Sequence, residues 1–243
     1  MKTLFRLFAF VLILSCFCQV SPAQMGEVSG GMPWTKFEEQ LGLPTTYSVD
    51  IVAHAMGMSM QSRMIRDGDK SRAEMTLPFM DLKAVMLSVQ EGDRIVNYSL
   101  FPEKMKYVVD ETVEAADKEA MPDIQELGTE MLDGVECIKR GFSSMENGIP
   151  VQFVFWFSPE QKNMPVKMTA SMQVPEAMMD ASMGNGAMET SVLFQNYDFS
   201  TPDASLFELP EGYARASNIM EVMMDGNGAK DLDALFQQLQ PTK

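Results

Sequence analysis

Histidine is almost absent from this chain of 243 residues, in which His54 is the single example. That count excludes multi-histidine metal sites and most histidine-based catalysis. Basic residues are also few, since 19 Lys and Arg stand against 34 Asp and Glu, for a formal net charge of −15. A chain this acidic repels the phosphates of nucleic acids and of anionic lipid surfaces. Nucleic-acid binding is therefore excluded as its function.

Catalytic motifs are missing as well. The sequence has no serine nucleophile elbow, no glycine-rich phosphate loop and no Cys–His pairing. Closely spaced acids occur at Asp67 and Asp69 and again at Glu111, Glu114 and Asp117, but such acids are typical of solvated turns and helix faces. We therefore predict that the protein is not an enzyme and needs no cofactor.

Only three cysteines are present, and two of them lie in an N-terminal segment with the pattern of a secretory signal. Lys2 and Arg6 precede a short apolar run, and a small-x-small cleavage site ends at Ala23. No run in the chain approaches the roughly 20 residues that cross a bilayer, so the protein is predicted not to be transmembrane. A lipobox ending at Cys16 is the alternative. Cleavage after Ala23 predicts a periplasmic or secreted protein without an internal disulfide, in which Cys137 is a buried strand residue.

Beyond the signal, the hydrophobic pattern has mostly the two-residue period of strands. A short helix is expected first, at 32–43, within an N-terminal region of 24–44. Strands are expected at 47–65, 71–77, 83–89, 94–100, 104–109, 128–131, 135–142, 151–157, 166–174 and 191–199, with a turn at 66–69. The acidic segment 111–127 is interpreted as a helix broken near Pro122, 175–189 as a long loop, and 218–224 and 230–239 as helical pieces. The expected fold is mainly β, one antiparallel domain with a few short helices.

Methionine is unusually abundant, with 24 residues, and several occupy one face of an expected strand. If 47–65 is a single strand, His54, Met56, Met58 and Met60 all point to the same side. Thioethers and an imidazole at that spacing suit a soft ion such as Cu(I) or Ag(I). The other interpretation is an adaptable apolar lining, because methionine fills irregular spaces.

Other strands have equally regular apolar faces. Phe153, Phe155 and Phe157 alternate with other residues on one strand, and Met168 and Met172 do so on the next. With Met75 and the three methionines at 56–60, they make up the candidate apolar binding residues.

Two motifs resemble those of a known superfamily. Phe155-Trp156-Phe157-Ser158-Pro159 is followed by Met164-Pro165-Val166-Lys167-Met168, and the strand region ends in Leu206-Phe207-Glu208-Leu209-Pro210-Glu211-Gly212-Tyr213. Both are similar to motifs of the LolA-like carriers, which sort lipoproteins to the outer membrane. Segments 64–72, 105–107 and 126–137 are similar to an uncharacterised secreted branch of that superfamily. The resemblance covers roughly residues 45–213 and leaves 214–243 as a C-terminal helical extension.

The resemblance implies an open, strongly curved half-barrel whose concave apolar face is covered by helices and shields acyl chains. Arg66 is a loose match to a functional arginine near the lip of the carriers' cavity. The leading hypothesis is thus an exported, non-enzymatic protein that binds lipid or lipoprotein acyl chains and serves transport across the periplasm, with other envelope proteins as further candidate partners. The soft-metal site and an interaction or sensor module with a filled core are the alternatives. The methionine-rich loop at 175–189 fits a flap over a groove as well as an insertion without a role.

Overall fold

The computed structural model describes residues 34–55, 57–77, 82–91, 94–110, 123–146, 149–173 and 187–224. The expected signal peptide with Cys16, the helix at 230–239 and most of the methionine-rich loop lie outside these residues, as does Met56.

Twelve strands of the described residues form one sheet in the order β12-β6-β5-β4-β3-β2-β1-β11-β10-β9-β8-β7. Every neighbouring pair is antiparallel except β12 and β6, which are parallel. The strands are β1 (Thr46–Ala55), β2 (Met58–Asp67), β3 (Lys70–Leu77), β4 (Leu82–Glu91), β5 (Arg94–Phe101), β6 (Lys106–Asp110), β7 (Gln125–Leu132), β8 (Val135–Glu146), β9 (Ile149–Ser158), β10 (Met164–Gln173), β11 (Ala187–Asp198) and β12 (Ala214–Arg215).

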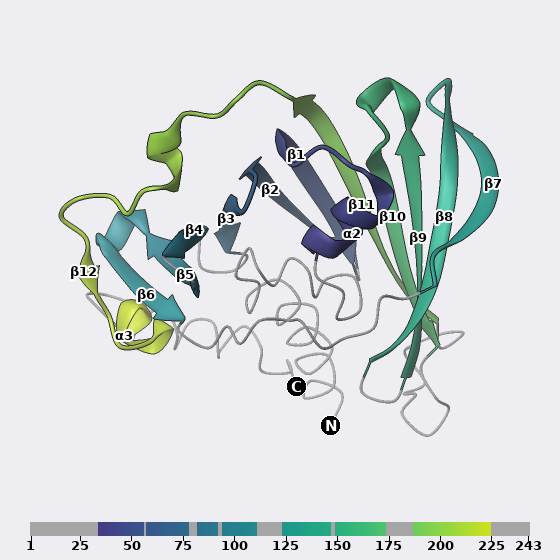
Figure 1. Ribbon diagram of the computed structural model, residues 1–243. Coiled ribbons are helices and arrows are strands. Elements are labelled where there is room, and N and C mark those ends of the chain that lie inside the picture. Colours follow the sequence, from purple (N-terminus) through teal and green to yellow (C-terminus); the bar gives the residue numbers. More distant parts are fainter. Residues whose placement is uncertain are drawn as a thin grey trace, which may run out of the picture.

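The sheet is strongly curved and does not close, so β7 and β12 remain its two edges (Figure 1). Helix α2 (Trp34–Leu41) lies inside the curve, where the ring of Phe37 is 5.1 Å from that of Phe155 and 6.0 Å from that of Phe157. Helix α3 (Ile219–Met224) contacts β6 and buries Val222 in the core cluster of β3 and β4. We call the face that carries these helices the concave face and the opposite one the convex face. The predicted half-barrel, with short helices over its concave side, is confirmed.

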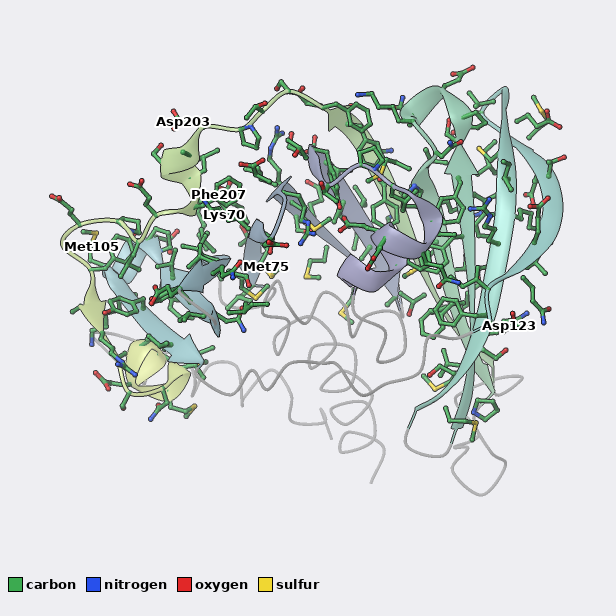
Figure 2. The ribbon with its side chains drawn as sticks, viewed as in Figure 1. Lys70, Met75, Met105, Asp123, Asp203 and Phe207 are labelled. Carbon is green, nitrogen blue, oxygen red and sulfur yellow. The ribbon has the colours of Figure 1, made fainter. Side chains whose placement is uncertain are left out.

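The C-terminal segment after β11 covers part of the convex face. Its short helix η5 (Ala204–Phe207) is capped by Asp203, whose side chain accepts a hydrogen bond from the backbone N–H of Ser205. Phe207 packs into a second cluster with Leu87 and Leu100, and Arg72 donates to the carbonyl oxygen of Leu206 over 3.0 Å. Figure 2 shows Phe207 and the concave-face residue Met75 on opposite sides of the sheet. Both faces of β3–β5 are therefore covered in part.

One strand prediction is wrong. The expected single strand at 47–65 is a hairpin, β1 and β2, in which His54 lies opposite Ser59 and Ala55 opposite Met58. The chain reverses at Gly57, whose φ of +78° is a left-handed conformation that glycine adopts without steric cost. A hairpin interrupts the two-residue alternation only briefly, so the pattern on both sides is that of one long strand.

The acidic segment is the second correction. Residues 125–127 were expected to end a helix but begin the edge strand β7, while 111–122 lie outside the described residues. The other described strands agree with expectation within a few residues, as do α2 and α3. None of the helices that the structure describes is long and apolar enough to cross a membrane. Cys137 is buried as predicted, and burial raises the pKa of its thiol.

Candidate ligand-binding face

The apolar residues singled out in the sequence lie on one face of the sheet. Residues directly opposite each other in adjacent strands share a face. Met60 lies opposite Ala53, and Ala53 lies opposite Val192. Val192 in turn lies opposite Met168, and Met168 opposite Phe155. The same procedure assigns every described member of the candidate set to the concave face: Met58, Met60, Met75, Phe153, Phe155, Phe157, Met168 and Met172.

The concave face is filled unevenly. Phe153, Phe155 and Phe157 are each at most 3% exposed, and Phe37 from α2 packs onto the last two. The helix thus occupies the aromatic sector of the face. Met58, Met60 and Met172, by contrast, are only half-buried, and the last two pack at the margin of the core. The methionine sector near the β1–β2 hairpin is consequently more open to a ligand than the aromatic sector.

At the ends of β1 and β2 that lie away from their hairpin, the concave face carries a buried ion pair. Arg66 on β2 donates through Nη2 to Oε2 of Glu38 on α2 over 2.7 Å, and the Tyr47 hydroxyl donates to Oε1 over 3.0 Å. The Arg66 side chain is 5% exposed and that of Glu38 1%. Tyr197 packs beside Tyr47, and burial raises its pKa well above the usual value. Arg66 is therefore placed on the predicted face as a buried anchor for α2, and not at an open lip.

A row of polar residues continues from Arg66 across the sheet. Arg66 on β2 lies opposite Ser71 on β3, Ser71 opposite Ser88 on β4, and Ser88 opposite Asn97 on β5. The three additional residues are each 2% exposed. Among the described residues nothing hydrogen-bonds to either the amide nitrogen or the amide oxygen of Asn97, and Nε of Arg66 is likewise without a partner. We call Arg66, Ser71, Ser88 and Asn97 the polar row.

Sequence reasoning did not find the polar row. Each member is a single polar residue at a core position of a different strand, and only the register aligns the four. Glu38 was missed for a related reason, because the partner of Arg66 lies 28 positions away on a helix. A polar residue at a core position of an otherwise alternating strand is the one signal that could have drawn attention to them.

The soft-metal arrangement rests on the strand prediction that proved wrong. Because the chain turns at Gly57, Met58 and Met60 lie on the concave face and His54 on the convex face, opposite Ser59 and Ser191. A cavity of about 380 Å³ there is lined in part by His54, Ser59 and Ser191. In the part of the chain that the structure describes, no group of three or more His, Cys, Asp or Glu residues could hold a metal ion.

A second, larger cavity of about 690 Å³ crosses the convex face over β1 to β4. Four of its charged side chains already form ion pairs: Arg63 pairs with Asp50 over 3.1 Å and Arg72 with Glu74 over 2.7 Å. This polar groove differs from the apolar concave face and offers an acyl chain little to bind.

Comparison with known proteins gives likeness in structure but none in sequence. No protein-family model matches the chain, and no curated protein matches it significantly. An uncharacterized conserved protein from Thermus thermophilus superposes with a TM-score of 0.50 at 10% identity, over 74% of this chain and 94% of that one. That likeness shows a shared fold.

Two further solved structures match with lower scores. The lipoprotein LppX of Mycobacterium tuberculosis has a TM-score of 0.36 at 14% identity, over 75% of this chain and 99% of its own. A Vibrio parahaemolyticus domain provisionally assigned to outer membrane lipoprotein sorting has a TM-score of 0.30 at 10% identity, over 73% and 95%. The curved, unclosed sheet described above agrees with the fold that the resemblance to the LolA-like carriers implies.

Proposed function

We propose that the protein is an exported, non-enzymatic carrier that binds lipid or lipoprotein acyl chains on the concave face of its half-barrel. The observation that supports this most directly is the common placement of the eight described candidate residues, which come from four strands and lie on one face. An apolar face of this width on an unclosed sheet needs a cover, either from the chain itself or from a ligand.

The energetics suit hydrocarbon. Each methylene removed from water contributes about 0.8 kcal/mol, so a long acyl chain binds without polar anchors. The half-buried methionines are flexible and adapt to chains of different shape. The acidic exterior would keep such a carrier from adhering to anionic membranes. With the expected signal peptide, the site of action is the periplasm or the medium, and envelope proteins are its further partners.

The test is a single charge placed in the methionine sector. Met58→Asp should weaken the binding of N-phenyl-1-naphthylamine, an uncharged apolar dye, by about tenfold. The dye would lose contact with the apolar end of the methionine side chain, and apolar contact equivalent to two methylenes is worth about 1.6 kcal/mol. Ser59→Asp is the matched control, since Ser59 is the next residue but is exposed on the convex face. Dye binding that is equal in folded Met58→Asp, folded Ser59→Asp and the parent protein would remove the concave face as the binding site.

A second candidate, an interaction module with a filled core, is favoured by the Phe37 contacts that already cover Phe155 and Phe157. Native mass spectrometry of protein purified gently from an exporting host separates the two. A bound lipid mass released by organic solvent supports the carrier. A bare polypeptide mass, together with no dye uptake, favours the filled module.

A further inference from the structure

The polar row on the concave face has a property that the acyl-chain proposal leaves unexplained. Burying an amide without a hydrogen-bond partner costs about 1–3 kcal/mol for the group left unsatisfied. Asn97 is 2% exposed, and neither its amide nitrogen nor its amide oxygen has a partner among the described residues. Asn97 lies opposite Ser88 on β4 and Asp110 on β6, and the nearest buried apolar positions of the concave face are Met86, diagonal to it on β4, and Phe101, four residues further along β5.

The polar groups of the row lie along one line across four adjacent strands. Asn97 is the direct neighbour of Ser88, which adjoins Ser71, which adjoins Arg66. Three strand spacings of about 4.8 Å put the ends of this polar row roughly 14 Å apart. Along it lie two hydroxyls and three groups that have no partner among the described residues: the Nε–H of Arg66 and the amide nitrogen and oxygen of Asn97. A group that both donates and accepts hydrogen bonds is needed to satisfy them.

The row carries no spare positive charge. The guanidinium of Arg66 is paired with the carboxylate of Glu38 at 2.7 Å, and both side chains are at least 95% buried. A carboxylate or phosphate placed here would be a second buried anion, and an uncompensated buried charge is far more costly than a buried polar group. The chemistry of the row therefore selects an uncharged group.

The position of the row relative to the apolar surface fits an amphipathic molecule. The row lies at the end of β2 next to the β2–β3 turn, whereas Met60 and Met58 lie at the other end of the same strand. The eight residue steps from Arg66 to Met58 span about 26 Å, at a rise of about 3.3 Å per residue. The end of the concave face at the polar row thus offers hydrogen bonds, and the other end of β2 offers apolar contact from Met58 and Met60.

We propose that the polar row binds the uncharged, hydrogen-bonding headgroup of the ligand, such as a glycerol ester or an amide, while the hydrocarbon lies along the concave face toward Met58. This inference rests on the proposed carrier function and adds to it a headgroup site centred on Ser88 and Asn97. It makes the ligand a neutral acylglycerol or an acyl amide, and excludes a free fatty acid or an anionic phospholipid as the preferred ligand.

The test measures how well two amphiphiles with the same hydrocarbon displace N-phenyl-1-naphthylamine. We expect monooleoylglycerol to displace the dye from the parent protein at least tenfold more effectively than oleate. Asn97→Leu should weaken the binding of monooleoylglycerol by tenfold or more. The affinities for the dye itself and for oleate should stay unchanged. The control is Gln152→Leu, a similar exchange at an exposed convex position of β9. If Asn97→Leu does not fold, Ser88→Ala takes its place, because it removes one hydroxyl and little volume. It should also lower the affinity for monooleoylglycerol.

The outcomes separate this inference from the function on which it rests. A parent protein that takes up neither dye nor monooleoylglycerol overturns the carrier function itself. Dye uptake with unaltered monooleoylglycerol affinity in folded Asn97→Leu and Ser88→Ala leaves the carrier in place and overturns the headgroup site, whose amide would then hold only a bridging water. A preference of the parent protein for oleate over monooleoylglycerol would overturn the inference that the bound headgroup is uncharged.

Discussion

Replacing Arg66 by leucine tests whether the ion pair beneath α2 holds the helix on the concave face. The guanidinium and the Glu38 carboxylate are 2.7 Å apart and almost fully buried, and the carboxylate also accepts a hydrogen bond from the Tyr47 hydroxyl. At an effective dielectric constant of about 20, two charges about 4 Å apart attract by about 4 kcal/mol. Removing one partner of such a pair typically costs about 3–5 kcal/mol, because the other charge stays buried without its counterion.

We therefore expect Arg66→Leu to lower the free energy of unfolding by about 3–5 kcal/mol in urea titrations followed by circular dichroism. Adding Glu38→Leu should restore much of the loss, since the buried carboxylate is then gone as well. Arg63→Leu is the matched control on the same strand. Arg63 pairs with Asp50 at 3.1 Å, but the two side chains are 46% and 36% exposed, so its loss should cost less than about 1 kcal/mol.

Two results would refute this reasoning. One is an equal cost, within about 0.5 kcal/mol, for Arg66→Leu and Arg63→Leu, which would mean that burial adds nothing to the pair. The other is a double variant no more stable than Arg66→Leu alone, which would place the cost in lost packing of the arginine side chain and not in the buried charge.

Two further predictions concern the strands. Gly141→Ala should lower the free energy of unfolding by about 1–3 kcal/mol in the same titration, because an added Cβ would be 2.9 Å from the carbonyl oxygen of Phe153 and 2.8 Å from Leu127 Cδ1; unchanged stability would contradict the close approach. Burial, with the hydrogen bond to Glu91 and its negative charge, raises the pKa of Tyr98 to about 12. Since the unfolded chain ionises this phenol near pH 10 while the folded protein keeps it protonated, stability should fall as the pH rises from about 10 toward 12. Absorbance titration at 295 nm checks the raised pKa of Tyr98. Tyr98→Phe should remove an inflection of the titration curve near pH 12 and none near pH 10.

The facing of side chains within a strand was predictable from the sequence because the two-residue period of a strand is local. Phe153, Phe155 and Phe157 share a face whatever the neighbouring strands do, and the structure places them together against Phe37. The same locality explains the correct expectation of a mainly β fold with α2 at its start. Exported character and the absence of an enzymatic function remain predictions of the sequence alone.

Tertiary structure decided everything that depends on how strands align with one another. A one-residue change in alignment moves a side chain to the other face, and the reversal at Gly57 accordingly separated His54 from Met58 and Met60. Register is set by turns and by packing between strands distant in sequence, and no local pattern records it. For the same reason only the folded sheet joined Arg66 to Glu38 and aligned it with Ser71, Ser88 and Asn97.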